Sequence, residues 1–306
     1  MIRPRREKFA VSQARDRGSL GFKSRMVERE GSVMSIAKRG IITVPPTMSI
    51  KGAAGIMAKH GFRRLPVADP GTKRLLGIIG SSDIIDFLGG GEKARLLQDK
   101  HKGNFLAAVN DSVREIMVTD VISLDREDDL KDCLSMMLRS GVGGVVIIDD
   151  DRRVVGMITE RDFVYMLAGK STGKNAEEYM TKRVVMASPE MTLGEATRAM
   201  ARYSFRRLPV VEDKKLVGML TTRDIIQFIG NNKIFTRMRS GKLEGVLDTP
   251  VGEIMKEEVS TVSGETDLGD VARIIEESGR GTVCVVGPGG LEGILTERDI
   301  MRTLVD

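Results

Sequence analysis

Short apolar runs alternate with amphipathic stretches along the chain, and the pattern is clearest between residues 121 and 169. "VISL" is a short apolar run, and apolar residues then recur at helical spacing in "DDLKDCLSMMLRSG" as far as Gly141, a residue type that commonly ends helices. "GGVVIID" and "VVGMIT" predict two strands separated by the polar turn "DDDRR", and "ERDFVYMLAG" predicts a second helix. The predicted unit is strand, helix, strand, strand, helix.

The step from the last strand to the last helix of this unit occurs four times. The copies read "GIIGSSDII", "GMITERDFV", "GMLTTRDII" and "GILTERDIM", and each has an aspartate near the start of the helix. These aspartates are Asp83, Asp162, Asp224 and Asp299. A pattern that returns at a fixed spacing indicates a repeat architecture, in which neighbouring units bury each other's apolar faces.

The four repeats fall into two classes. The first and third contain "FRRLPV", at residues 62–67 and 205–210, whereas the second and fourth contain the glycine-bearing strings "SGVGGVVI" and "SGRGTVCV" and then "TERD". The duplicated object is therefore a pair of repeats about 140 residues long. Because a unit of about 60 residues buries too little apolar surface to be stable alone, we expect sheets to pack in pairs within two globular units, residues 31–170 and 174–306.

Composition agrees with a globular repeat protein. Of the 306 residues, 41% are hydrophobic and 30% are charged, and no apolar run approaches the length of about 18 residues needed to span a bilayer. We therefore expect a cytoplasmic protein without membrane contact, in which Cys133 and Cys284 are reduced core residues. The predicted segments, a basic arm and four repeat domains, are residues 1–30, 31–90, 111–169, 174–230 and 249–306.

The net charge of +5 is concentrated at the N-terminus. Residues 1–40 contain 11 Lys and Arg against 4 Asp and Glu. Such an arm can contact nucleic acid or an acidic partner, although a solvated charged tail is the commoner explanation.

The order of elements, the Thr-x-x-Asp step and the pairing of repeats resemble four tandem CBS domains arranged as two Bateman modules. The resemblance covers nearly the whole chain after residue 30. It implies an α/β (α+β) fold with sheets packed in pairs and flanking helices, and clefts that bind AMP, ADP, ATP or S-adenosylmethionine. The layout and the "FRRLPV" strings are also similar to archaeal-type CBS-domain proteins and to the gamma subunit of AMP-activated protein kinase, where a basic pair at that place contacts phosphate.

Three copies carry Thr-x-x-Asp at the strand-to-helix step. This spacing predicts a helix cap, in which the hydroxyl and the carboxylate satisfy free backbone donors. A carboxylate at a helix start can also accept both hydroxyls of a ribose, and the resemblance favours that second role. The candidate ribose-binding residues are Asp83, Thr159, Asp162, Thr221, Asp224, Thr296 and Asp299. Gly80 replaces the threonine in the first copy, so we expect the four sites to differ in affinity.

Arginines are the candidate phosphate ligands, because a planar guanidinium can bind two phosphate oxygens at once. The candidates are the pairs Arg63 with Arg64 and Arg206 with Arg207, and the residues before three aspartates, Arg161, Arg223 and Arg298. Neighbouring residues on a strand point to opposite faces, so at most one arginine of each pair is expected to enter a given cleft. A solvated charge pair at a turn is the alternative.

These features predict a regulatory sensor with AMP, ADP or ATP as its ligand, read by an unidentified protein partner or by self-association as a homodimer. No enzyme activity and no catalytic cofactor or metal is expected, because the chain has only two histidines and no nucleophile beside a base. Two alternatives remain: a nucleic-acid-binding regulator that uses residues 1–40, and an S-adenosylmethionine sensor.

Overall fold

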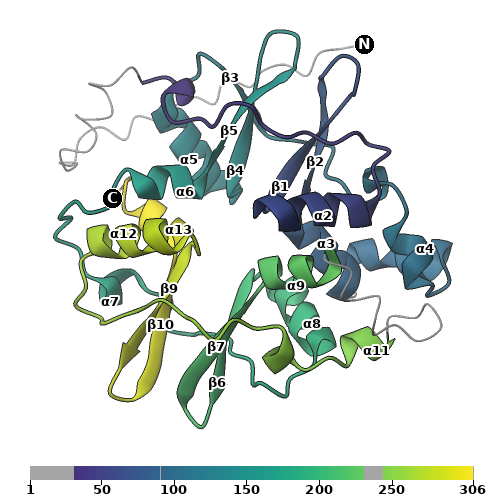
Figure 1. Cartoon of the computed structure of the whole chain (residues 1–306). Helices are drawn as coiled ribbons and strands as arrows, with labels where there is room; N and C mark the ends of the chain where they lie inside the picture. Colours follow the sequence, from purple (N-terminus) through teal and green to yellow (C-terminus); the bar gives the residue numbers. More distant parts are fainter. Residues whose placement is uncertain (1–30, 90, 231–243, 306) are drawn as a thin grey trace.

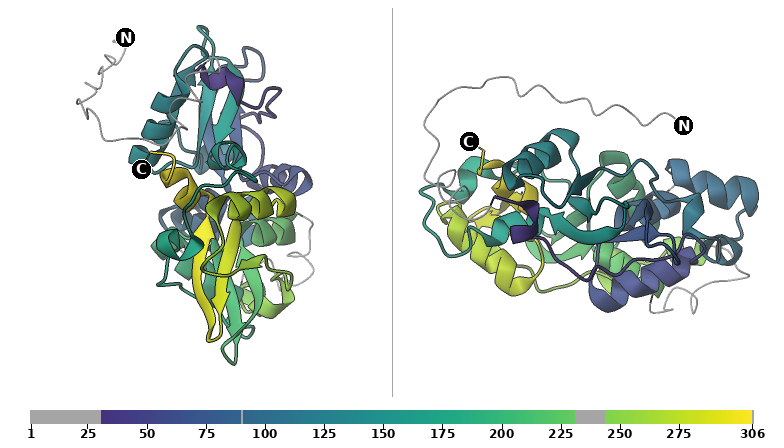
Figure 2. Two further views of the ribbon diagram at one scale, coloured as in Figure 1. Left: turned by 90° about the vertical axis from the view of Figure 1, so that its left-hand side faces the viewer. Right: turned by 90° about the horizontal axis from the view of Figure 1, so that it is seen from above.

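Four repeats surround a common centre (Figure 1). The computed structural model describes residues 31–89, 91–230 and 244–305, so the predicted basic arm, residues 1–30, lies outside the described residues. Two further views show that the assembly is flatter than it is wide (Figure 2). Within the described ranges, every helix is too short or too polar to cross a membrane.

Repeats 1 and 3 share one arrangement, a helix followed by a two-stranded antiparallel hairpin and a second helix. Repeat 1 contains α2 (Ile50–His60), β1 (Arg64–Ala68), β2 (Leu75–Gly80) and α3 (Ser81–Gly89). Repeat 3 contains α8 (Leu193–Tyr203), β6 (Arg207–Glu212), β7 (Lys215–Thr221) and α9 (Thr222–Gly230).

The expected first strand of repeats 1 and 3 is reduced to an isolated parallel bridge. Val44 pairs with Val67, and Ala187 pairs with Val210. Proline follows within two residues in both repeats, in "VPPT" and "ASPE", and proline has no N–H with which to extend a ladder. The bridge therefore marks where a strand begins but cannot continue.

Repeats 2 and 4 have the complete predicted order, strand, helix, strand, strand, helix. Repeat 2 contains β3 (Ser123–Asp125), α5 (Leu130–Ser140), β4 (Gly144–Ile148), β5 (Val154–Thr159) and α6 (Glu160–Tyr165). Repeat 4 contains β8 (Thr261–Val262), α12 (Leu268–Ser278), β9 (Thr282–Gly287), β10 (Gly290–Thr296) and α13 (Glu297–Arg302). In each repeat the first strand is parallel to the second and the third is antiparallel to it.

The helix ends follow from local side chains. The Asp129 side chain accepts from the Lys131 backbone N–H at 2.7 Å and caps α5, which ends at Gly141 with a φ of 68°. At the start of α8, Thr192 and Glu195 cap each other's backbone N–H groups reciprocally. These caps confirm the predicted helix of repeat 2 and its glycine stop.

The segment before each repeat packs on the other repeat of its half. Short elements in these lead-in and linking segments are η1 (Val33–Ser35), η2 (Glu92–Ala94), η3 (Leu96–Lys100), α4 (Phe105–Val109), η4 (Val113–Glu115), α7 (Ala176–Tyr179), α11 (Glu244–Leu247) and η5 (Val251–Glu253). Backbone bridges join Lys38 to Met157, Val118 to Ile78, Thr181 to Ile294 and Lys256 to Met219. Within each half, the extended segment before one repeat therefore pairs with a strand of the other repeat.

The sheets pack in pairs within each half, as expected. Leu75 of repeat 1 meets Val146 and Ile148 of repeat 2 in one small apolar cluster. A matching cluster joins Met219 of repeat 3 to Cys284 and Ile294 of repeat 4. Both cysteines are free and buried.

The two large hydrophobic cores cross between the halves, so the two expected units, residues 31–170 and 174–306, also pack against each other. One core combines repeats 1 and 3, where α2 packs on α9 and α3 packs on α8; the other combines repeats 2 and 4 through α6, α12 and α13. The buried residues of α9 explain why the cores combine helices of both halves, because Ile225, Ile226, Phe228 and Ile229 are all buried. Apolar residues at such spacing cover more of the helix than the face turned toward its own sheet.

Glycine lets the crossing helices approach closely. A Cβ on Gly230 would lie 2.9 Å from the Ala58 Cβ of α2. We predict that Gly230→Val pushes α9 away from α2 and lowers the free energy of unfolding by about 1–3 kcal/mol, measured by urea denaturation.

Gly55, also on α2, provides the control, because a Cβ there would meet nothing within 4 Å. Gly55→Ala should raise the free energy of unfolding by about 0.5–1 kcal/mol, the usual gain from replacing glycine inside a helix. A Gly230→Val protein as stable as the wild type would show that α2 and α9 are not in contact in solution.

Candidate functional site

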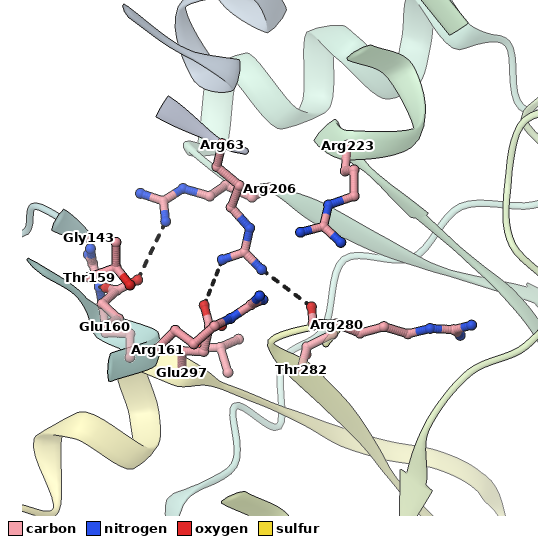
Figure 3. Close-up of polar contacts among 12 residues, drawn as sticks. Arg63, Gly143, Thr159, Glu160, Arg161, Arg206, Arg223, Arg280, Thr282 and Glu297 are labelled. Atoms are coloured by element: carbon pink, nitrogen blue, oxygen red, sulfur yellow. Dashed lines mark hydrogen bonds and ion pairs between the residues drawn. The ribbon is translucent and has the colours of Figure 1, made fainter. Parts of the chain in front are cut away.

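Charged side chains from all four repeats point toward one another at the centre of the ring, among them Arg63, Arg161, Arg223 and Glu297 (Figure 3). All seven predicted arginines line the cavities around this centre: Arg63, Arg64, Arg161, Arg206, Arg207, Arg223 and Arg298. They come from all four repeats. Arg63 and Glu297, which form an ion pair at 2.6 Å, are 234 positions apart in the sequence.

Two buried glutamates lie among these arginines and were not among the predicted site residues. Glu297 accepts from Arg63 Nη1 at 2.6 Å and from Arg161 Nε at 2.7 Å. Glu160 accepts from Arg298 Nε at 2.6 Å and lies 3.6 Å from Arg206 Nη1. Burial by itself raises the pKa of the Glu297 carboxyl, but Arg63 and Arg161 outweigh burial and hold that pKa at about 2.

The sequence does contain a signal for these glutamates. They stand in "TERD", which only repeats 2 and 4 contain, whereas repeats 1 and 3 have Ser81 and Thr222 at the same place. Those two hydroxyls meet each other at 3.2 Å in the structure. The difference between the two classes of repeat therefore marks the residues that balance the arginines.

Glycine and arginine alternate around the centre in a complementary way. Gly143 and Gly281 stand in repeats 2 and 4 at the places of Arg63 and Arg206 in repeats 1 and 3. A Cβ on Gly143 would lie 2.5 Å from Arg64 Nη2, and a Cβ on Gly281 would lie 2.5 Å from Arg63 Nη2. The glycines therefore make room for guanidinium groups that the other class of repeat supplies.

The arginines also bind backbone carbonyls at the centre. Arg161 Nη2 donates to the Gly279 oxygen at 2.9 Å, and Arg298 Nη2 donates to the Gly141 oxygen at 2.5 Å. Arg64 Nη1 donates to the Gly143 oxygen at 2.9 Å. These contacts hold the guanidinium groups in place but do not neutralise them, since a carbonyl carries no net charge.

Positive charge remains in excess at the centre. Burial, together with the nearby charge of Arg206, lowers the pKa of Arg64 to about 9. Burial, together with Arg63, lowers the pKa of Arg207 to about 10. Burial is the larger cause of both shifts and repulsion from neighbouring arginines adds to it, so an additional anion at the centre would relieve that repulsion.

The alternation of faces along a strand requires no more than one arginine of each pair to face a given cleft, but both line one cavity in the structure. Arg63 and Arg64 line the same cavity, and so do Arg206 and Arg207. The strands begin at Arg64 and Arg207, so the first arginine of each pair precedes its strand and does not follow the alternation of faces.

The Thr-x-x-Asp steps form the predicted caps. Oδ2 of Asp162 accepts from both the backbone N–H and the hydroxyl of Thr159, at 2.8 and 2.7 Å. The corresponding distances are 2.8 and 2.5 Å from Thr221 to Asp224, and 3.0 and 2.7 Å from Thr296 to Asp299. Each cap uses one oxygen and leaves Oδ1 for another partner.

The second oxygens differ between the repeats. Oδ1 of Asp162 lies 3.4 Å from Lys38 Nζ, and Oδ1 of Asp299 lies 3.4 Å from Arg302 Nη1. Oδ1 of Asp224 has no hydrogen-bond or ion-pair partner among the residues that the structure describes. Burial raises the pKa of the Asp224 carboxyl, and the hydrogen bonds from Thr221 only partly offset this effect.

Repeat 1 departs from the pattern at the place that its sequence indicates. The Gly80 backbone N–H donates to Asp83 Oδ2 at 2.6 Å, but no threonine hydroxyl accompanies it. Oδ1 of Asp83 forms an ion pair with Lys93. The Asp83 carboxylate thus has its charge satisfied from within the chain.

Three cavities open around the centre, and each combines the same kinds of surface. The Asp224 cavity, of about 230 Å³, has Met219 and Val259 in its wall. The Asp299 cavity, of about 410 Å³, has Val184 and Phe205, and the Thr159 cavity, of about 240 Å³, has Ile42 and Phe62. Each therefore offers a threonine or aspartate at one side, apolar walls, and arginines toward the centre, which suits a ligand with a diol, a flat apolar group and an anion.

Known proteins resemble this chain along most of its length. Protein MJ1225 of Methanocaldococcus jannaschii is 38% identical over 273 residues, which are 88% of this chain and 98% of that protein. Its crystal structure, described as that of a proposed archaeal homologue of g-AMPK, covers 89% of this chain and 99% of its own with a TM-score of 0.83. A 33.4 kDa protein of a ribosomal RNA operon in Thermofilum pendens is 29% identical over 86% of this chain and 88% of its own.

The family comparison agrees with the repeats seen in the fold. Residues 33–90, 113–169, 176–231 and 251–306 each match the CBS domain. The four matches together span most of the chain, and the fold shows the corresponding small sheets with flanking helices. This chain therefore belongs to the CBS domain family, with four CBS domains arranged in two pairs.

Proposed function

We propose that this protein is a regulatory sensor that binds the adenine nucleotides AMP, ADP or ATP in the cavities around the ring centre. CBS-domain pairs are regulatory ligand-binding modules. The observation that carries the proposal is the Asp224 cavity, where a buried aspartate, whose Oδ1 has no partner among the described residues, shares one wall with a cluster of arginines. The description of the Methanocaldococcus protein as a proposed homologue of g-AMPK supports a nucleotide as the ligand.

A nucleotide fits the Asp224 cavity in one orientation. The ribose hydroxyls donate to the free oxygen of Asp224, the phosphate lies toward Arg63 and Arg206, and the base lies against Met219 and Val259. A hydrogen bond to a charged group contributes about 1.5–3 kcal/mol, so two of them to the diol account for a large part of the affinity. The same orientation places the ligand's charge next to the arginines that line this cavity.

The cavities share residues, which gives a route to regulation. Arg63 lines both the Asp224 and the Thr159 cavities, and Arg206 and Arg207 line both the Asp224 and the Asp299 cavities. A ligand phosphate that draws a shared arginine toward one cavity removes it from the other, so occupancy of one site changes the affinity of the next. A protein partner, or a second copy of the chain, then responds to the arrangement that the ligands favour, and no catalysis is needed.

S-adenosylmethionine is the second candidate ligand. It offers the same ribose diol, but it carries a sulfonium cation in place of phosphate. The excess of arginine at the centre favours an anion over a cation at that position. The alternative of nucleic-acid binding rests on residues 1–40, most of which lie outside the described residues.

We predict that Asp224→Asn and Asp299→Asn, at the cavities that these residues line, and Asp162→Asn, next to the Thr159 cavity, each weaken AMP or ATP binding there by about tenfold or more, the equivalent of 1.4 kcal/mol. Calorimetry with AMP and with 2′-deoxy-AMP isolates the diol. The wild type should prefer AMP, and each Asn variant should lose that preference at its site, because the neutral amide no longer accepts strongly from both hydroxyls.

Asp270→Asn is the matched control, because Asp270 is an exposed aspartate on α12 that pairs only with Arg273 in the described structure. Its binding should equal that of the wild type. Equal affinity for AMP and 2′-deoxy-AMP in the wild type would contradict the ribose assignment, and tighter binding of S-adenosylmethionine than of any nucleotide would replace the proposed ligand.

The raised pKa of Asp224 makes a separate prediction about the free protein. Because the pKa is higher in the folded than in the unfolded state, the charged carboxylate destabilises the fold at neutral pH, and protonation removes this cost as the pH falls through the folded pKa. Asp224→Asn is therefore expected to raise the melting temperature at pH 7, with a smaller difference at pH 4. A lower melting temperature at pH 7 would show that the carboxylate is needed as a cap and not kept for a ligand.

A further inference from the structure

Glu160 and Glu297 occupy the guanidinium N–H groups that a bound phosphate would use. Glu297 accepts through both oxygens, from Arg63 at 2.6 Å and from Arg161 at 2.7 Å. Glu160 likewise faces Arg298 and Arg206 with its two oxygens. A carboxylate held by two guanidinium groups presents the same pattern of acceptors as two phosphate oxygens. Each glutamate therefore takes the place of an anion within the site.

The glutamates are distributed unequally over the cavities. Both line the Asp299 cavity, and Glu297 also lines the Thr159 cavity. At the equivalent place, the Asp224 cavity is lined by Thr222, whose hydroxyl carries no charge. The Asp299 cavity has five basic and three acidic residues in its described lining, whereas the Asp224 cavity has six basic and two acidic residues in the part of its wall that is described. The capacity for additional negative charge is therefore smallest at Asp299.

A purely structural role does not explain this distribution. Glu160 and Glu297 are too few to neutralise the seven arginines that line the cavities, and repulsion from neighbouring arginines adds to burial in lowering the pKa of Arg64 and Arg207. Burying a charged carboxylate also costs free energy. Both glutamates are buried, since Glu160 is only 3% exposed and Glu297 only 2%. Two buried charges placed beside some cavities, but replaced by Ser81 and Thr222 elsewhere, point to a role in selecting the ligand.

We propose that Glu160 and Glu297 are specificity-determining residues that limit the number of phosphate groups accepted in the Asp299 cavity. The first phosphate of a nucleotide finds free donors there, but each further phosphate must approach a carboxylate that already holds the guanidinium groups. The Asp224 cavity, with Thr222 at that position, accepts a longer phosphate chain. This inference rests on the proposed function for the identity of the ligand, but its physical basis concerns phosphate alone.

The test compares short and long phosphate chains with and without the carboxylate charge. Binding of AMP and ATP, and of inorganic phosphate and inorganic triphosphate, is measured by calorimetry for the wild type, Glu160→Gln and Glu297→Gln. Each Gln variant should increase the ratio of triphosphate to monophosphate affinity by about tenfold or more, both for the nucleotides and for the inorganic anions. An unchanged ratio in both variants would overturn the proposal.

The inorganic anions separate this inference from the proposed function. They have no ribose and no base, so a changed ratio for phosphate and triphosphate supports the role of the glutamates even in a protein that binds no adenine nucleotide. Conversely, tight nucleotide binding with an unchanged ratio would leave the proposed function intact and reject the role of the glutamates.

Two further variants guard against an effect of folding. Glu277→Gln, an exposed glutamate on α12 that pairs with Arg273, should leave the ratio unchanged. Glu297→Asp keeps the charge and should return the ratio toward that of the wild type. If a Gln variant is unstable, triphosphate should raise its melting temperature more than it raises that of the wild type, because the anion replaces the missing carboxylate. A melting temperature of the variant that triphosphate does not raise would contradict the proposal.

Discussion

Guanidinium groups crowded at one point repel each other, and the balance of that charge governs how the four repeats are assembled. Two carboxylates and several glycine carbonyls hold the arginines in place, while burial, together with neighbouring arginines, lowers the pKa of Arg64 and Arg207. In the low dielectric of a protein interior such repulsion costs far more than it would in water. An anion placed among the arginines would relieve part of that repulsion.

The two classes of repeat are complementary at this centre. Repeats 1 and 3 supply arginines before their second strands, and repeats 2 and 4 supply glycines at the same place together with a glutamate at the start of the following helix. The large cationic side chain of one class fits the space that the glycine of the other leaves open. Four identical repeats would bring either too many arginines or too little space to the centre, which is a physical reason for duplicating a pair of unlike repeats.

The hydrophobic cores couple this charged centre to the rest of the molecule. Because α2 packs on α9 and α3 packs on α8, a shift of one strand-to-helix step is transmitted to the opposite half through closely packed helices. The aspartates that cap α6, α9 and α13 lie at the same steps. In the sensor proposed above, ligand contact and helix position would therefore depend on the same few residues.

Much of the fold and some of the site followed from local patterns in the sequence. The repeat order, the helix stop at Gly141 and the Thr-x-x-Asp caps depend on neighbouring residues, so periodicity and capping chemistry were enough to predict them. The seven arginines proposed from the sequence all line the cavities, and their role as phosphate ligands stays a prediction.

The remaining features depend on contacts between residues far apart in the chain. The pairing of repeat 1 with repeat 3 requires knowing which helix faces meet, and the roles of Glu160 and Glu297 appear only when arginines from other repeats surround them. The approach of Arg63 to Gly281 is likewise a matter of assembled geometry. Local sequence determines which elements form and how they end, whereas only the tertiary structure decides which charges meet, because Coulomb interactions depend on distance in space and not on separation along the chain.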